Sequence, residues 1–329
     1  MSKFIGRQQY FGLAKEDTRG TAESTADYWY PFTDFSVQQR DEKTTDAPAY
    51  GRIEQSGNIE QVRKYSQGDI TALVGVNGMP LILENLLGSL SSSDNGDQTY
   101  THTITVKNDP VHQSLTMIRK DDVNQYAFPL GMLESFSLDI DIEADEKVYA
   151  EMSFTGKSSV SNDDTPSFDT DEVNFTPNML TITTADSGGG LDDGDDIPAK
   201  TFSIDISPES LERDHDFESG KEPSDINNLG LGVSGSFTAN FSDNTYEDLV
   251  FNNTTKAIRM ELKDTDTTIG SESENPSMRI DIEKAYFEEI EKSGGNDELV
   301  TQEISFQGRY DLGAAKMIEA TITNTESSY

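Results

Sequence analysis

Paired carboxylates are the first candidates for chemistry in this sequence. Asp139 and Asp141 stand two positions apart in an alternating apolar and acidic segment, so a strand would place both on one face. Two acids about 5 to 10 Å apart can cleave a glycosidic bond. The chain holds 61 Asp and Glu residues, however, so such pairs arise by chance, and Trp29 is the single tryptophan available as a sugar platform. We interpret the pair as a solvated strand face and predict no enzymatic activity.

Two acidic loops are candidates for calcium binding, because hard cations take several oxygen ligands from a turning loop. The carboxylates concerned are Asp192, Asp193, Asp195, Asp196, Asp264 and Asp266. Neither loop has EF-hand spacing, so we interpret both as acidic surface loops and predict no cofactor. Serine-nucleophile motifs, phosphate loops and basic-aromatic stripes are also missing from the sequence. The pattern indicates a protein that assembles.

Acidic residues dominate the composition, with 25 Lys and Arg and a net charge of -36. The acids alternate with apolar residues and are not gathered in one tail, which favours a folded chain. At molar salt the Debye length falls to about 3 Å and screens self-repulsion, so the composition is typical of a halophilic source. An acidic surface repels phosphates, which argues against gripping duplex DNA but allows DNA to slide past.

The sequence has no cysteine, which excludes disulfides and thiolate zinc sites. It has no apolar run of about 18 residues, and residues 1–30 lack the order of a signal peptide. We therefore expect a chain that is synthesised as a soluble protein in the cytoplasm and has no membrane partner.

Two hairpins and two short helices are predicted to position these residues. Residues 136–143 and 147–157 alternate as two strands of a hairpin, and 278–290 with 299–310 repeat the plan, with a bulge near 284–287. Pro80 and Gly88 bracket one leucine-rich helix, and Asn244 begins another. Residues 316–324 are predicted to form a final strand.

A repeated heptapeptide predicts two tandem copies of one β-rich unit. Residues 151–157 read Glu-Met-Ser-Phe-Thr-Gly-Lys, and residues 303–309 read Glu-Ile-Ser-Phe-Gln-Gly-Arg. A second echo pairs residues 56–59 with 234–237. A period this long suits two fused domains. The predicted organisation is an extended N-terminal arm that packs on a neighbour (1–27), a first domain (28–160), an acidic linker (161–197) and a second domain (198–329).

The ordered pattern resembles the major tail tube proteins of viruses with long, non-contractile, siphovirus-like tails. The matching segments are residues 16–22, 57–59, 86–88, 100–103, 131–138, 156–157, 232–241 and 322–324. The resemblance implies a mainly β fold of two barrel or sandwich domains, each with one short helix, that contribute strands to a shared ring barrel. The acidic composition then indicates a virus of halophilic archaea.

The resemblance also implies function and partners. Subunits of this family stack as rings around a channel for viral double-stranded DNA, and other tail proteins lie at the tube ends. A doubled subunit implies trimers with pseudo-sixfold symmetry, with hexamers as the alternative. The expected location is the virion tail. The competing interpretation is a secreted or cell-surface β-sandwich adhesin of a halophile with calcium-loaded loops.

If the hairpins line the channel, their polar faces supply the lumen. The candidates are Asp139, Asp141, Glu143, Glu151, Ser153, Asp281, Glu283, Glu303, Ser305 and Gln307. Negative walls would keep DNA sliding by repulsion. The other interpretation is that these side chains face solvent outside and are acidic because the whole chain is.

Overall fold

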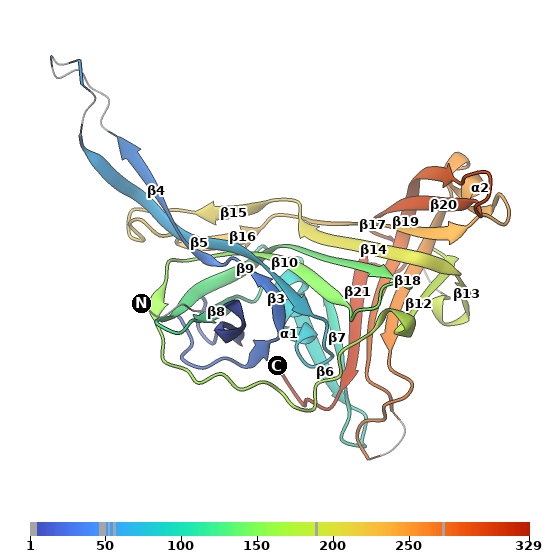
Figure 1. Cartoon of the computed structure of the whole chain (residues 1–329), viewed down its shortest axis with the longest axis horizontal. Helices are drawn as coiled ribbons and strands as arrows, with labels where there is room; N and C mark the ends of the chain where they lie inside the picture. Colours follow the sequence, from blue (N-terminus) through green and yellow to red (C-terminus); the bar gives the residue numbers. More distant parts are fainter. Residues whose placement is uncertain (1–4, 46–50, 52, 55–56, 188–189, 272–273) are drawn as a thin grey trace.

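The computed structural model describes residues 5–45, 51, 53–54, 57–187, 190–271 and 274–329. The chain is mainly β, with long strands in both halves of the molecule and a hairpin that projects from one end (Figure 1). Within the described residues, neither helix is long and apolar enough to cross a bilayer.

Eight antiparallel strands form the main sheet and join the two halves of the chain. Their spatial order is β4 (Gln38–Thr45), β5 (Ile59–Leu73), β10 (Tyr149–Gly156), β9 (Gln125–Asp141), β14 (Ala199–Pro208), β17 (Leu231–Asn240), β20 (Thr301–Gly308) and β19 (Ser277–Ser293). The short strand β3 (Phe32–Phe35) precedes β4 along the same edge of β5.

Further strands extend the two longest members of this sheet. β2 (Tyr28–Tyr30), β1 (Tyr10–Lys15) and β8 (Leu115–Lys120) continue from β9, which also pairs with β11 (Val160–Ser161). β13 (Asp195–Asp196), β12 (Leu180–Asp186) and β18 (Thr255–Lys263) continue from β19. β6 (Gly88–Asp94), β7 (Tyr100–Val106) and β21 (Ile318–Asn324) also reach β19. β15 (Leu211–Asp214) and β16 (Asp225–Asn228) form a separate hairpin.

Two α-helices and three 3-10 turns complete the fold. They are α1 (Met79–Leu87), α2 (Thr245–Phe251), η1 (Gly6–Gln8), η2 (Pro177–Met179) and η3 (Leu191–Asp193). Every residue of α1 is buried, and it ends at Gly88, whose φ of 97° suits glycine. α2 is shorter and has no buried residue.

Alternation along the main sheet creates one large core. Phe154 and Phe306 are 0% and 1% exposed, and both belong to a single hydrophobic cluster that takes side chains from both halves. A fully buried aromatic side chain of this kind contributes about 1.5–3 kcal/mol by removing its surface from water.

The predicted hairpins, helices and final strand are confirmed by β9–β10, β19–β20, α1, α2 and β21. The predicted bulge is confirmed too, because the register of β19 shifts between Ile282 and Ala285 against β18, and again at Glu288 against β20.

Two expectations need correction. The extended arm at 1–27 is wrong for β1, because Phe11 and Leu13 are buried in the core and β1 pairs with β8. The segment predicted as a linker at 161–197, in which residues 173–183 could form a strand, contains β12, which pairs with β18 along its whole length. Within the glycine run at 188–190 of this segment, residues 188–189 lie outside the described residues. The domain boundaries stay a prediction.

Candidate assembly surface

The main sheet repeats one strand order. In β4–β5–β10–β9 and again in β14–β17–β20–β19, the second strand pairs with the first and the third, and the third pairs with the last. The two sets of four meet at the β9–β14 ladder. We call the first set copy 1 and the second set copy 2.

The repeat extends to single residues. Glu151 lies opposite Thr71 on β5, and Glu303 lies opposite Thr238 on β17. Each hairpin also carries one extra residue at the same place, Glu134 in β9 and Glu288 in β19. Bulges change strand direction and are set by sequence, so their coincidence supports an equivalent register in the two copies.

A glycine faces the central phenylalanine in both copies. Gly68 lies opposite Phe154, and Gly235 lies opposite Phe306. A Cβ on Gly68 would meet the Val37 backbone at 2.5 Å, and one on Gly235 would meet the Ser203 carbonyl oxygen at 2.3 Å. Close approach of neighbouring backbones therefore requires glycine at both positions.

This register corrects the second sequence echo. The counterpart of Gly235 is Gly68 and not Gly57, which precedes β5 and has open space around it. The better match is Gly-Asp-Ile-Thr-Ala at 68–72 against Gly-Ser-Phe-Thr-Ala at 235–239. The two phenylalanines could have signalled it, because each needs a small residue opposite.

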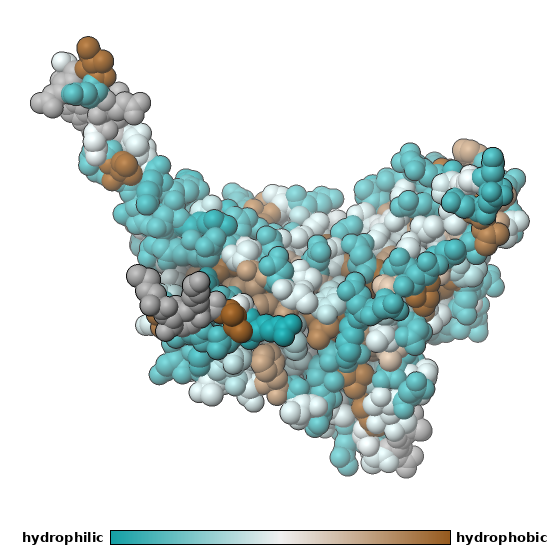
Figure 2. Space-filling view, in the orientation of Figure 1, coloured by the Kyte–Doolittle hydropathy of each residue, from teal (hydrophilic) through white to brown (hydrophobic). Residues whose placement is uncertain are grey.

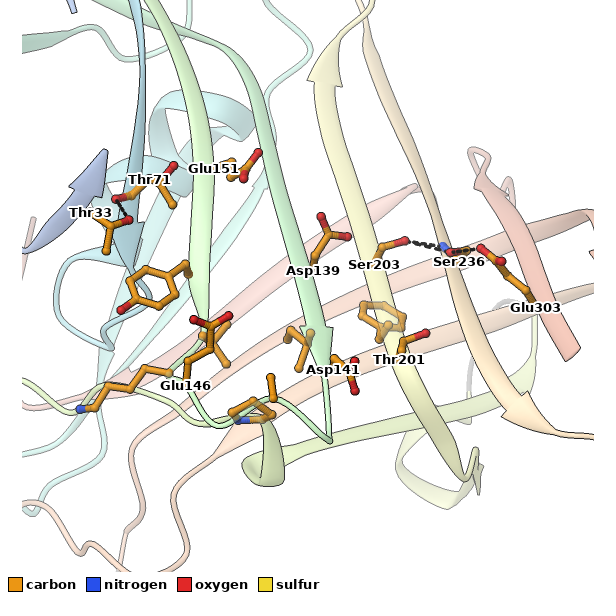
Figure 3. Close-up of a pocket in the computed structure, with 17 residues that line it drawn as sticks. Thr33, Thr71, Asp139, Asp141, Glu146, Glu151, Thr201, Ser203, Ser236 and Glu303 are labelled. Carbon is orange, nitrogen blue, oxygen red and sulfur yellow. Dashed lines mark hydrogen bonds between the residues drawn. The ribbon is translucent and has the colours of Figure 1, made fainter. Parts of the chain in front are cut away.

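The polar face of the main sheet is hollowed into a trough of about 790 Å³. Figure 3 shows acidic and hydroxyl side chains from β5, β10, β9, β14 and β17 lying along it, with Glu303 of β20 at one side. Asp139, Asp141, Glu151 and Glu303 are exposed and line it, as expected of one shared face. Ser153, Ser305 and Gln307 alternate onto the same face of β10 and β20.

Hydrogen bonds and charge define this face. Ser203 and Ser236 hydroxyls lie 3.0 Å apart, and the Ser236 hydroxyl donates to Glu303 Oε1 at 3.3 Å. Partial burial, with repulsion from Asp139, raises the pKa of Asp205. β10, β17 and β20 contain no Lys or Arg. The trough thus presents an excess of carboxylates and hydroxyls, with Lys147 as the one cation among the described residues that line it, to any polyanion that passes.

A comparison with protein families identifies the chain at this point. The family model described as phage tail tube protein matches residues 6–308. The chain belongs to the phage tail tube protein family. A search of curated proteins found no match. The family is structural, and its members self-assemble into the tail tube of the virion, so this is a structural virion protein. The match does not favour the adhesin interpretation.

Not every lumen candidate of this tail tube protein lies in the trough. Glu143 follows β9 and is exposed. Asp281 and Glu283 are buried, because they belong to the half of β19 that pairs with β18 and β21. Arg259 donates from Nε and Nη2 to the two Asp281 carboxylate oxygens at 2.7 and 2.9 Å. Lys316 Nζ lies 3.0 Å from Glu283 Oε1. We therefore leave these two out of the candidate lumen.

The calcium candidates have partners within the chain. Arg259 donates to Asp192 Oδ1 at 2.6 Å, and this contact lowers the pKa of Asp192. The Asp264 carboxylate accepts from the Asp266 amide at 2.9 Å and from the Thr267 hydroxyl at 2.6 Å. Across the described residues, no group of three or more His, Asp or Glu side chains is arranged to hold a metal ion.

Both ends of the main sheet present open edges. All eight residues of β4 are exposed. At the other end, the ladder between β18 and β19 stops at Tyr286, so residues 287–293 of β19 have β20 on one side only. Figure 1 places β4 and the α2 end of β19 at opposite ends of the molecule. Unpaired edges of this kind are templates for strand addition.

Sequence reasoning missed these edges and part of the trough. Asp69, Thr71, Ser203 and Ser236 share the face of the predicted lumen residues. Their signal was the alternation at 67–73, 201–206 and 234–239, where small polar residues alternate with apolar ones. The open edges depend on which strands meet in space, which the sequence pattern does not encode.

Proposed function

We propose that three chains close into a ring by pairing β19 of one chain with β4 of the next, and that stacked rings form the tube of a long, non-contractile tail. The observation that supports this is the repeated strand order with its internal β9–β14 ladder. That ladder joins the end of copy 1 to the start of copy 2. The strands at the two open edges of the sheet are the counterparts of this pair: β19 of copy 2 corresponds to β9, and β4 of copy 1 corresponds to β14.

The internal ladder supplies a register for the ring contact. Ser137 of β9 pairs with Asp205 of β14. Ser137 lies opposite Glu151 on β10, and Glu291 lies opposite the equivalent Glu303 on β20, so Glu291 is the counterpart of Ser137. Asp205 lies opposite Ser234 on β17, and Gln38 lies opposite the equivalent Gln67 on β5, so Gln38 is the counterpart of Asp205. Glu291 should therefore lie opposite Gln38 of the partner subunit. Six equivalent copies in three chains give the ring pseudo-sixfold symmetry.

In this ring the trough faces the channel, through which viral double-stranded DNA passes. The proposed lumen residues are Asp139, Asp141, Glu143, Glu151, Ser153, Glu303, Ser305 and Gln307. Carboxylates and hydroxyls repel phosphates, so DNA slides without being held. The net charge of -36 supports a halophilic archaeal host, where high salt screens repulsion between subunits.

Crosslinking tests the ring contact. Gln38→Cys with Glu291→Cys, treated in molar salt with a short bis-maleimide, should give covalent products that stop at three chains. The sequence has no native cysteine to interfere. The control pair Ser137→Cys with Asp205→Cys should crosslink only within a chain. Crosslinked products of up to six chains would replace the trimer with a hexamer. Rings that form without any crosslinked product would refute the register.

A charge reversal tests the lumen. Asp139→Lys with Asp141→Lys should leave rings intact in negative-stain images, because both side chains are exposed. It should reduce infectivity by slowing DNA passage. The matched control is Asp193→Lys with Asp195→Lys, an exposed pair away from the trough. Unchanged infectivity of the first variant would count against the lumen assignment.

A further inference from the structure

An apolar notch remains uncovered at the α2 end of the molecule. Phe241 and Val300 are 37% and 44% exposed there, and Phe251 and Leu299 are 73% and 74% exposed. Figure 2 shows apolar side chains among hydrophilic ones at this end of the molecule. Isolated exposed apolar residues are ordinary, but Phe241 and Val300 are joined through their backbones and Leu299 is next in the chain, so these three form a group that indicates a contact surface.

The equivalent place in copy 1 is covered. The Val74 amide donates to the Val148 carbonyl at 3.0 Å, and the Phe241 amide donates to the Val300 carbonyl at 2.9 Å in the same way. Val74 and Val148 are nevertheless 0% and 2% exposed. The two pairs are structural counterparts, so the difference in exposure comes from what lies over them.

The cover in copy 1 is a segment centred on Phe175. The Phe175 amide donates to the Val74 carbonyl at 3.1 Å, and the Val148 amide donates to the Phe175 carbonyl at 3.0 Å. Phe175 itself is 0% exposed. Asn174 next to it forms an isolated β-bridge with Gly75. The segment thus crosses the end of β5 and the start of β10 in copy 1.

The chain contains one counterpart of this cover. Phe175 precedes η2 by two residues, and η2 leads into β12, which pairs with β18. η1 leads in the same way into β1, which pairs with β8, the counterpart of β18. Counting back two residues from η1 gives Phe4, which lies outside the described residues.

We propose that residues 2–5 of the next chain in the ring cover the notch, with Phe4 in the place that Phe175 takes in copy 1. This inference rests on the proposed ring, in which the start of one chain follows copy 2 of its neighbour. A chain does not reach its own notch, because β1 and β8 lie at the opposite end of the molecule from α2 (Figure 1).

Charge favours the same occupant. Residues 1–9 carry Lys3 and Arg7 and no acid, within a chain whose net charge is -36. Beside the notch lies a groove of about 430 Å³ whose charged lining residues are Glu247, Glu288, Glu289 and Lys292. Lys292 is paired with Glu247 at 2.6 Å, so the groove keeps an excess of negative charge. A basic segment with an apolar anchor therefore matches an acidic rim around an apolar floor.

A second crosslink tests the occupant. Because Asn174 bridges Gly75, Lys3 should lie beside Ser242 of the partner subunit. Lys3→Cys with Ser242→Cys should yield covalent products up to the trimer with a short bis-maleimide, whereas Lys3→Cys with Leu312→Cys should stay monomeric. Leu312 is 90% exposed and lies outside the notch. The Gln38→Cys and Glu291→Cys pair reports the ring independently.

The outcomes separate the two proposals. Ring crosslinks without the Lys3–Ser242 product would overturn the N-terminal cover and leave the ring standing, whereas loss of both would overturn both. Phe4→Ser should also raise the concentration needed for ring assembly about tenfold or more, since one buried aromatic contact is lost. Leu312→Ser is the control and should leave that concentration unchanged. Equal assembly of the two variants would contradict an anchoring role for Phe4.

Discussion

Glu172 should make the stability of the subunit depend on pH in an unusual direction. Its carboxylate accepts from the Tyr28 hydroxyl at 2.7 Å and from the Asn77 amide at 2.9 Å. Burial raises the pKa of Glu172 to about 7, and the nearby carboxylates of Asp169 and Glu326 add to the rise. The folded chain therefore holds this proton where the unfolded chain has lost it.

The sign and size of the effect follow from linkage. The pKa is raised, so the stabilising contribution is complete below the unfolded value of 4.5 and is lost as pH rises through about 7. The difference is about 2.5 in pKa, and each unit corresponds to about 1.36 kcal/mol, so the free energy of unfolding falls by up to about 3 kcal/mol. Other carboxylates also titrate in this pH range, so the contribution of Glu172 is obtained from the difference in unfolding free energy between the native protein and a variant that lacks this carboxylate.

Glu172→Gln provides that difference. Glutamine keeps an oxygen that accepts from the Asn77 amide, and it does not titrate. Denaturant unfolding of the full chain in molar salt measures the free energy of unfolding of both proteins. From pH 5 to pH 8 the value for the variant should rise relative to that of the native protein by up to about 3 kcal/mol. Glu218→Gln, at an exposed carboxylate, should show no such gain. A Glu172→Gln difference that is the same at both pH values would refute the reasoning.

Four further outcomes are expected. Phe306→Ala should lower the free energy of unfolding by about 3–5 kcal/mol in denaturant titrations, because it empties a fully buried site. Gly235→Ala should lower it by about 1–3 kcal/mol, whereas Gly57→Ala, with open space around it, should change it by less than about 0.5 kcal/mol. Arg259→Ala should lower it by about 1.5–3 kcal/mol, because Asp281 loses two charged hydrogen bonds and keeps only Arg279, whose Nε lies 3.4 Å from Asp281 Oδ2. Lowering the salt should dissociate rings before it unfolds subunits, as sedimentation and circular dichroism together would show.

Sequence alternation predicted the hairpins because each of their strands buries one face. Leu138 and Phe154 alternate with Asp139 and Ser153, and a period of two leaves one choice of face. The heptapeptide repeat pointed to the same hairpin in both halves, and the repeated strand order agrees with it.

Other features depend on contacts between distant segments. β1 was expected to be an arm because its short run at 10–15 shows no period, yet four of its six residues are buried. Strands covered on both faces lose the alternating signal. Asp281 and Glu283 share the alternation of the lumen candidates, but β18 and β21 flank that half of β19. Nothing local distinguishes them from Asp139.

The two copies differ in character where the proposed ring contact lies. At the internal ladder Leu138 of β9 pairs with Ile204 of β14, and both are buried. The corresponding position in β19 is Lys292, and its neighbour Glu291 already lies opposite Glu303 across the hairpin. Charged residues protect an open edge from unwanted pairing, and like charges directly opposite each other destabilise it. Screening by salt removes that repulsion without changing the apolar core. The internal ladder therefore acts as a permanent joint, whereas the edge between chains is suited to pairing only when salt and a neighbouring subunit are both present.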